Sequence, residues 1–461
     1  MKKITFFLGS IIVVLIFGCN SKLESQNSGG NTQLDTTIIA RGLEVPWEIL
    51  WGPDNYIWVT ERPGRVLRIN PDTKVRKQIL HVNVETQGES GLLGMALHPD
   101  FPQTPTVYLV YTYLDAGNIK ERLVSYTYQQ DSLINETILI NNITGNTYHD
   151  GSRLIFGPDN KLYMSTGEAG NMPLAQDTTS LNGKILRINP DGSVPDDNPI
   201  HGSYVFTLGH RNPQGLDFAP SGIFYESEHG PDTDDEINII ETGRNYGWPT
   251  VRGMCDLPEE LDFCTQYNVK EPIAHYTPTL AVAGIAYYKY NLIPEWTNSL
   301  IVTSLKAGKL MVLKLDDQGL TITGTTIVYD NTLGRLRDVC VSNTGRLFFS
   351  TSNRDGRGTP REGDDKIIEI KPSSTNSISK PDKSTGLNIY PNPAKGKLRA
   401  DINTDYQDGF FSIYDLMGNL KMKGNNSQLS QGIDVSNLSS GLYNILIHNG
   451  TKYASASLVI L

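Results

Sequence analysis

Apolar and polar residues alternate along most of this chain in short runs of four to seven positions bounded by Gly, Pro, Asn or Asp. This pattern is typical of β-strands joined by tight turns. Two runs share one organisation. A Gly-Pro-Asp-Asn turn, at 52–55 and again at 157–160, leads into an apolar strand, and Arg-Ile-Asn-Pro-Asp follows at 68–72 and 187–191. The chain therefore carries an internal repeat.

Four looser copies follow the same order of turn, strand and strand, and no long helical stripe occurs between Ile38 and Pro372. Because a sheet of a few short strands cannot bury both faces alone, six such units predict an all-β fold, a six-bladed β-propeller over residues 36–372. The segment Thr36–Ala40 is expected to pair with the last blade and close the ring. A pair of β-sandwiches is the alternative. The strand pairs of the looser copies are expected at 106–110 and 122–128, 223–226 and 236–240, 299–303 and 309–315, and 346–351 and 366–371.

The N-terminus has the composition of a targeting segment. Two lysines precede the apolar run Ile4–Phe17, which is short for a bilayer span but typical of a signal peptide, predicted over 1–19. Cys19 ends a stretch that resembles a bacterial lipoprotein cleavage box, so lipidation and ordinary cleavage both remain open. A polar tether over 20–35 is expected to lead to the first blade.

A second domain is expected after the repeat. Residues 373–386 have linker composition, rich in Ser, Thr, Lys and Pro, and residues 387–461 return to short alternating strands that predict a small β-sandwich. Three motifs in this part, Asn388–Pro393, Ile413–Gly418 and Leu438–Tyr443, resemble the C-terminal sorting domain of type IX secretion cargo in the Bacteroidetes. The resemblance implies the type IX secretion machinery as a partner and a secreted or cell-surface protein. A carbohydrate-binding or stalk module is the alternative.

Charge and cysteine content narrow the function classes. The net charge of −10 and the 20% charged residues argue against a nucleic acid or an anionic membrane as partner. Cys255 and Cys264 are spaced to close a small disulfide ring in an oxidising compartment. Cys340 lies in an apolar run and is expected to be a buried thiol. No cysteine spacing supports a zinc site.

One histidine lies where a rigid scaffold would carry function. His149 is in a loop directly before the strand of the second Gly-Pro-Asp copy, and loops of this kind carry catalytic residues disproportionately. An imidazole is the side chain best suited to take a proton near neutral pH. The alternative is a packed or solvated side chain.

Four cationic side chains in other loops suggest an anionic ligand. Arg211 precedes Asn212, Lys306 lies at a turn between strands, and Arg335 and Arg337 alternate on one strand and therefore share a face. Several guanidinium and ammonium groups meeting on one face would suit a ligand with several carboxylates or phosphates. Each of them alone is better explained as a surface charge or a salt-bridge partner, and only their convergence on one propeller face would favour the ligand.

An acidic loop over 228–236 contains a Gly-Pro turn at Gly230 and Pro231. Carboxylate and carbonyl oxygens suit calcium, but the spacing does not match the EF-hand loop and an acidic run is commonly just solvated. A calcium site and a solvated loop therefore both remain open from the residues alone.

Together these loops resemble one family, the soluble glucose/sorbosone dehydrogenases. Its members are six-bladed propeller quinoproteins that use pyrroloquinoline quinone (PQQ) and calcium. The resemblance runs from about Ile38 to Pro372, in order. The motifs that carry it are Pro46-Trp47, 59–65, Glu89–Gly94, His149–Leu154, Gly209–Leu216, 230–238, Asn245–Pro249 and Arg335–Asp338.

The resemblance implies a role for each site residue. It implies that His149 is the general base that takes the proton of the anomeric hydroxyl of an aldose, while hydride passes to the quinone and a lactone forms. An external electron acceptor would then reoxidise the cofactor. By the same resemblance Arg211 acts with Asn212 at the reacting quinone oxygen and Glu89 belongs to the cofactor site. The resemblance also implies that the cofactor's three carboxylates are bound by Lys306, Arg335 and Arg337. It implies that the backbone carbonyls of Gly230 and Pro231 hold the calcium ion.

Two functions of different classes follow. The first is a PQQ- and calcium-dependent oxidoreductase acting on aldose sugars outside the cytoplasm. The second is a non-catalytic propeller that binds glycans or proteins at the cell surface, because fold alone does not fix chemistry. The joint presence of His149, Arg211, Lys306, Arg335 and Arg337 favours the enzyme.

Overall fold

The computed structural model describes residues 26–27, 29–30, 32–373, 387–402, 404–406, 408–416, 418–449 and 453–461. The predicted signal peptide with Cys19, half of the predicted tether and nearly all of the predicted linker lie outside these residues. The chain divides into two compact units between Ser373 and Ser374, and each is described by itself. Among the described residues, no helix has the length and apolar character needed to cross a membrane.

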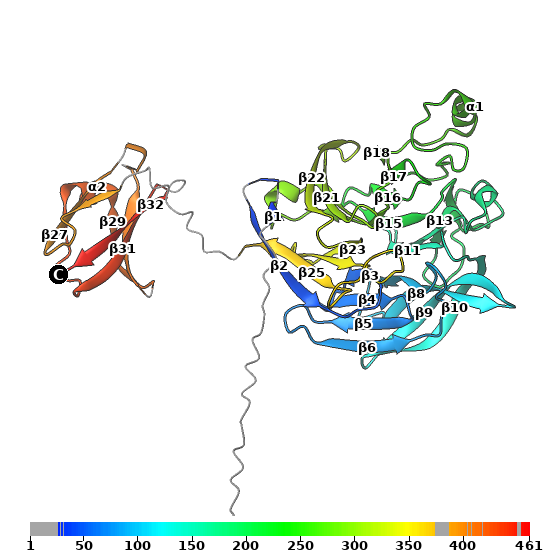
Figure 1. Ribbon diagram of the computed structural model, residues 1–461, viewed down its shortest axis with the longest axis horizontal. Helices are drawn as coiled ribbons and strands as arrows, with labels where there is room; N and C mark the ends of the chain where they lie inside the picture. Colours follow the sequence, from blue (N-terminus) through cyan, green and yellow to red (C-terminus); the bar gives the residue numbers. More distant parts are fainter. Residues whose placement is uncertain are drawn as a thin grey trace, which may run out of the picture. The chain divides into compact units, whose positions relative to one another are not determined.

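Six antiparallel sheets make up the first unit in the part of the chain that the structure describes (Figure 1). Five have four strands each, and the sixth combines the end of the unit with its beginning. In chain order the sheets are β3 (Pro46–Trp51), β4 (Ile57–Glu61), β5 (Arg65–Ile69) and β6 (Arg76–His81); β7 (Leu92–Leu97), β8 (Thr106–Asp115), β9 (Asn118–Gln129) and β10 (Ser132–Thr144); β11 (Gly151–Phe156), β12 (Leu162–Thr166), β13 (Lys184–Ile188) and β14 (Val205–Leu208); β15 (Pro213–Phe218), β16 (Phe224–Glu228), β17 (Asp235–Ile240) and β18 (Ala274–Tyr276); β19 (Val282–Tyr288), β20 (Ser299–Ser304), β21 (Lys309–Leu315) and β22 (Ile322–Asp330); and β23 (Leu336–Val341), β24 (Leu347–Thr351) and β25 (Ile367–Pro372) with β2 (Gln33–Ala40) and β1 (Gln26–Asn27).

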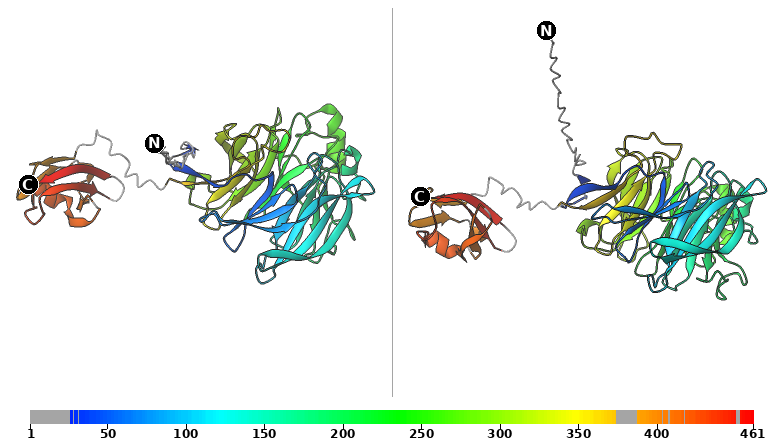
Figure 2. Two further views of the ribbon diagram at one scale, coloured as in Figure 1. Left: turned by 60° about the horizontal axis from the view of Figure 1, so that its bottom comes forward. Right: turned by 90° about the horizontal axis from the view of Figure 1, so that it is seen from below.

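The sheets follow one another around the unit. The first strand of each sheet contacts the first strand of the next, from β3 through β7, β11, β15 and β19 to β23, and β23 contacts β3 again. The N-terminal β2 pairs with β25, Thr36 lying opposite Ile370, so the blue and yellow ends of the unit lie side by side (Figure 1, Figure 2). This confirms the predicted pairing of Thr36–Ala40. The all-β architecture of successive four-stranded sheets is that of a β-propeller.

The hydrophobic core lies between neighbouring sheets. Six clusters of buried side chains each join one sheet to the next, for example Trp58 and Val66 with Leu92 and Leu109 between the first two sheets. The others join the remaining neighbours in the same way, including the last sheet with the first. A sheet therefore buries both faces only because it has a neighbour on each side.

The repeated Gly-Pro-Asp turns connect the first and second strands of a sheet. In two of them the first residue donates its N–H to the carbonyl four residues on, Gly52 to Tyr56 at 2.8 Å and Gly157 to Lys161 at 2.9 Å. The fourth residue of each turn, Asn55 or Asn160, has a positive φ. Asn tolerates this left-handed conformation better than other non-Gly residues, which explains its place in the motif.

The two ends of the repeated phrase meet in space. Asp54 of the first turn forms an ion pair with Arg68 at 2.6 Å, and Asp159 of the second forms the equivalent pair with Arg187 at 2.8 Å. Asp54 also accepts a hydrogen bond from Nε1 of Trp58 at 3.1 Å. The Asp and the Arg of the motif thus join the turn before the second strand of a sheet to its third strand.

One helix interrupts the strands of the first unit where no helix was predicted. Helix α1 (Pro258–Tyr267) lies between β17 and β18, and Cys255 is bonded to Cys264 within it. The predicted disulfide is confirmed, and Cys340 is a buried free thiol as expected. Two 3₁₀ turns, η1 (Met172–Ala175) and η2 (Pro294–Trp296), lie elsewhere in the unit.

The second unit consists of two small sheets that share one hydrophobic core. A three-stranded sheet contains β26 (Asn388–Tyr390), β27 (Lys397–Asp401) and β30 (Ile433–Asp434). Side chains of both sheets, including Leu398, Ile413 and Ile445, meet in the core. The predicted β-sandwich stays a prediction. The other elements are β28 (Phe410–Asp415), β29 (Leu420–Asn425), β31 (Gly441–His448) and β32 (Tyr453–Ile460) in a four-stranded sheet, with η3 (Thr404–Tyr406) and α2 (Asn426–Gln431).

Candidate active site

A cavity of about 330 Å³ lies where the first strands of the sheets begin. Its size falls at the small end of the roughly 300–1,000 Å³ usual for ligand sites. All of the site residues predicted from the sequence except Asn212 line it. The complete lining is Arg62, Glu89, His149, Arg211, Gln214, His229, Gly230, Pro231, Asp235, Thr279, Ala281, Leu305, Lys306, Arg335, Arg337, Asp355 and Arg357.

The lining carries an excess of positive charge. Six of its side chains are cationic and three are anionic, so three positive charges remain without an anionic counterpart in the cavity wall. The cations are Arg62, Arg211, Lys306, Arg335, Arg337 and Arg357, and the anions are Glu89, Asp235 and Asp355.

Asp355 orients Arg335 and Arg337, the two arginines that were predicted to bind the cofactor. Its Oδ2 accepts a hydrogen bond from Nε of Arg335 at 2.7 Å and lies 3.7 Å from a guanidinium nitrogen of Arg337. Burial lowers the pKa of Arg337 to about 10, with Asp355 acting against this shift, so the group stays charged at neutral pH. One carboxylate thus fixes two cations while neutralising only one charge.

Lys306 and Arg211 reach the cavity from two other loops. Nζ of Lys306 donates to the hydroxyl of Thr279 at 2.9 Å and faces no carboxylate there. Arg211 donates to the carbonyl of His229 at 3.0 Å, while its buried Nε has no hydrogen-bond partner among the described residues. Burial lowers the pKa of Arg211. Such unpaired donors in a cavity suit an anionic ligand.

His149 occupies a tight loop that glycines make possible. Its φ is +61°, and Gly167 packs so closely against its carbonyl that an added Cβ would lie 1.8 Å from the His149 oxygen. The neighbouring Gly151 also has a positive φ, +68°. The backbone therefore holds the imidazole in one place at the start of β11.

The imidazole of His149 is held by a carboxylate that the sequence did not point out. Nδ1 of His149 pairs with Oε1 of Glu168, which is 1% exposed. The ring of Tyr148 packs edge-on against the imidazole, with the ring centroids 4.7 Å apart. With Nδ1 donating to the carboxylate, Nε2 is the atom left to accept a proton.

Glu89 and Gly230 also line the cavity. Glu89 accepts a hydrogen bond from the N–H of His149 at 3.4 Å and pairs with Arg357 at 2.9 Å. Gly230 donates its N–H to Oδ1 of Asp235 at 2.9 Å. The Gly230-Pro231 turn therefore enters the cavity wall on a fixed backbone.

Asn212 lies just outside the cavity. It is fully buried, and its Oδ1 accepts hydrogen bonds from the N–H of Gly151 and from Nε2 of Gln214, both at 3.1 Å. Gln214, its hydrogen-bond donor, does line the cavity. The assignment of Asn212 to the cofactor stays a prediction.

Sequence reasoning missed several lining residues and one residue behind them. Arg62 directly follows β4, and Glu168 lies two residues after the end of β12. These positions could have marked them, because loops at strand ends carry function. His229 was counted only as part of an acidic loop, yet burial, helped by the charges of Arg337 and Arg211, lowers its pKa well below the usual range. It is therefore a neutral imidazole in the cavity wall, and its Nε2 has no partner among the described residues.

Comparison with known proteins identifies the family. Residues 43–360 match the model of the family described as glucose / sorbosone dehydrogenase. The chain belongs to this family. The predicted family is thereby confirmed. Residues 388–461 match the model described as secretion system C-terminal sorting domain, which confirms the second predicted resemblance.

Individual members of the family are similar over most of their length. Quinoprotein glucose dehydrogenase B of Acinetobacter calcoaceticus is 31% identical over 78% of this chain and 91% of that protein. Aldose sugar dehydrogenase YliI of Escherichia coli is 29% identical over 70% of this chain and 91% of that protein. The PQQ-bound form of aldose sugar dehydrogenase from Streptomyces coelicolor, 32% identical, has a TM-score of 0.65 and covers 74% of this chain and 99% of its own.

Proposed function

We propose that this protein is a PQQ- and calcium-dependent dehydrogenase that oxidises aldose sugars at the anomeric carbon to lactones. The observation that carries the proposal is the meeting of His149, Arg211, Lys306, Arg335 and Arg337 in one cavity. They come from four loops and the strand β23, and His149 and Arg337 are 188 positions apart in sequence. Family membership and the relatives named as quinoprotein or aldose sugar dehydrogenases support the same chemistry.

The residues present fit PQQ. A tricarboxylate would offset the positive charge that the cavity wall leaves unmatched, to which the proposed calcium ion would add. Lys306, Arg335 and Arg337 would hold its carboxylates, and Arg211, Asn212 and Glu89 would surround its reacting end. When bound, PQQ supplies the hydride acceptor. An external electron acceptor of unknown identity would take the electrons onward.

His149 is the general base of the proposed reaction. Its Nε2 takes the proton of the anomeric hydroxyl, because Nδ1 is engaged by Glu168. The buried Glu168 carboxylate stabilises the imidazolium that forms. Glu168 is therefore a positioning residue that acts through His149.

The backbone carbonyls of Gly230 and Pro231 would hold the calcium ion. Both residues line the cavity, and Asp235, which also lines it, fixes their turn by accepting hydrogen bonds from the N–H of Gly230 and from the amides of Leu280 and Ala281. Carbonyl oxygens are ligands that calcium accepts. The ion would act there as a Lewis acid.

The proposal extends to the fold and the cell. We take the six sheets to be six propeller blades and the second unit to be a β-sandwich. The match of residues 388–461 to a secretion system C-terminal sorting domain supports export by type IX secretion, to the cell surface or the medium.

The test is reconstitution of the full chain with PQQ and CaCl₂, followed by dye reduction with a panel of aldoses. We expect turnover that depends on both additions, lactone as the product by mass spectrometry, and a primary isotope effect with aldoses deuterated at C1. Saturable glycan binding without any dye reduction would instead favour the binding propeller.

A further inference from the structure

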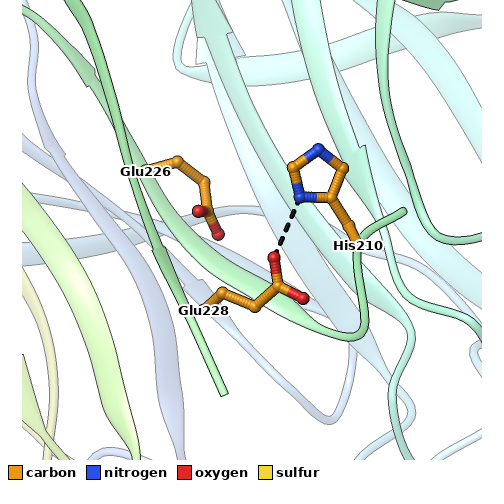
Figure 3. Close-up of side chains that lie close together, drawn as sticks. All are labelled: His210, Glu226 and Glu228. Carbon is orange, nitrogen blue, oxygen red and sulfur yellow. Dashed lines mark hydrogen bonds and ion pairs between the residues drawn. The ribbon is translucent and has the colours of Figure 1, made fainter. Parts of the chain in front are cut away.

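Three buried side chains converge beside the loop that carries Arg211 (Figure 3). His210 lies in that loop, and Glu226 and Glu228 lie two positions apart on β16, so they share a face of the strand. One nitrogen or carboxylate oxygen from each of the three lies within 4.8 Å of the others. The exposed fractions are 0% for His210 and Glu226 and 4% for Glu228.

The outer oxygen of each carboxylate is anchored. Oε1 of Glu228 accepts hydrogen bonds from the backbone N–H groups of Arg211 and Asn212, the second at 3.2 Å. Oε2 of Glu226 accepts from the amide of Asn238 at 2.9 Å. Each carboxylate is thus held through one oxygen, and its other oxygen lies toward the other side chains of the three-residue cluster.

The imidazole of His210 is anchored in the same manner. Its Nε2 pairs with the hydroxyl of Thr207 at 2.9 Å, and the ring stacks on Tyr246 with centroids 4.5 Å apart. Nδ1 therefore faces Oε2 of Glu228, 2.9 Å away. A ligating histidine whose second nitrogen is hydrogen-bonded and whose ring plane is fixed is the usual outer arrangement of a metal site.

The remaining oxygen, Oε1 of Glu226, has no hydrogen-bond partner among the described residues although the side chain is fully buried. Figure 3 shows this carboxylate turned toward Glu228. In the described part of the chain, His210 is the one side chain that forms an ion pair with either carboxylate. Two buried carboxylates this close need compensation.

We propose that His210 Nδ1, Glu226 Oε1 and Glu228 Oε2 bind one divalent first-row transition cation of the zinc type. Two carboxylates neutralise the ion, and an imidazole ligand disfavours calcium, which takes oxygen ligands. The ligating form of His210 is the neutral tautomer whose single proton is on Nε2 and is donated to Thr207. Binding therefore exchanges the ring proton from Nδ1 to Nε2 through solvent, with no net proton released by the imidazole. The site is separate from the calcium proposed at Gly230 and Pro231.

Such an ion would stiffen the dehydrogenase cavity from behind. Glu228 holds the amides of Arg211 and Asn212, so an ion that fixes Glu228 also fixes the loop from which the Arg211 guanidinium reaches the cavity. The ion would have a structural role and would contact neither substrate nor cofactor.

The experiment uses the full chain without a polyhistidine tag and without PQQ, so its outcome is independent of dehydrogenase activity. After EDTA treatment and dialysis, ZnCl₂ is titrated against a competing chromophoric chelator, and bound metal is measured by mass spectrometry. We expect one Zn²⁺ per chain, and at least tenfold weaker binding in Glu226→Gln and in His210→Gln. Glu121→Gln, which also removes a buried carboxylate but lies on β9, should bind like the wild type.

Two results would overturn the proposal: no Zn²⁺ bound at micromolar concentration, or Zn²⁺ binding by Glu226→Gln equal to that of the wild type. Circular dichroism checks that each variant folds. If neither variant folds, Co²⁺ added to the wild-type apoprotein decides the matter. Visible d–d bands that Zn²⁺ abolishes support the site, and their absence contradicts it.

Discussion

Oε1 of Glu168 accepts a hydrogen bond from Nδ1 of His149 at the wall of the charged cavity, and Glu168 is almost completely buried. The backbone N–H of Glu168 in turn donates to the carbonyl of Arg211 at 2.9 Å. The proposed base, its positioning carboxylate and a proposed cofactor ligand thus form one connected unit. Displacing any of the three would disturb the other two.

Replacement of Glu168 by Gln tests the positioning role. An amide can donate as well as accept, so the tautomer of His149 is no longer fixed and the imidazolium loses its counter-charge. We expect kcat to fall by about 10²–10⁴-fold with little change in KM or PQQ affinity. Steady-state kinetics and PQQ titration measure this, and Glu259→Gln on the exposed start of α1 is the control. An unchanged kcat would remove Glu168 from the account.

Replacement of Arg337 by Met tests the anion site. The side chain is buried beside the cavity, and its loss leaves Asp355 still paired with Arg335. We expect the Kd for PQQ to rise about 10- to 100-fold, the usual worth of a charge-assisted hydrogen bond. Arg346→Met is the matched control, because Arg346 pairs with Glu369 and does not line the cavity. Equal loss in both variants would point to general destabilisation.

Replacement of Gly230 by Ala tests the calcium turn. A Cβ there would lie 2.0 Å from the carbonyl oxygen of Thr233, so the backbone of the turn has to shift. We expect the calcium concentration for half-maximal activity to rise at least tenfold, because carbonyl ligands must be in place before the ion arrives. Gly324→Ala on β22 has no atom within 4 Å of the new Cβ and serves as control. Identical calcium curves would exclude this turn.

Asp217 gives the unfolding free energy a pH dependence. Burial raises its pKa from 3.8 to about 6, although the amides of Tyr287 and Phe218 act against this shift. Between about pH 4 and 6 the folded protein therefore holds a proton that the unfolded chain has lost. The free energy of unfolding falls as pH rises through this window, by about 3 kcal/mol at most.

Asp217→Asn should remove this fall. Urea unfolding of the wild type and the variant at pH 4, 5, 6 and 7 measures it. The difference in unfolding free energy between the two proteins should shift in favour of the variant as pH rises and become constant above pH 7. A difference that does not change with pH would show that Asp217 is ionised in the folded protein throughout.

The sequence predicted the second and third strands of the sheets far better than the first. β4, β12 and β16 each begin with two or three apolar or aromatic residues shortly after a clear turn, so the repeat exposed them. β11 and β15 were not recognised, because inner strands must carry residues such as Arg153 and Gln214 that serve the centre of the ring. A strand that gives polar side chains to a site loses the pattern by which strands are found.

Site residues show the same limit. His149 and Arg337 could be proposed from motifs, but Glu168 could not, because its role depends on the contact between two loops that only the folded chain creates. Helix α1 escaped notice because ten residues with no clear apolar face look like loop. The His210 cluster joins one loop to β16, and no sequence spacing reports that.

The most direct measurement is single-turnover reduction of bound PQQ by an aldose, followed by absorbance in the wild type and in His149→Asn. We expect both proteins to bind one PQQ per chain with similar affinity. We expect the wild type to reduce the bound PQQ and the variant to do so at least 10³-fold more slowly. Reduction at equal rates in both proteins, or no PQQ bound by the wild type in the presence of calcium, would contradict the proposed function.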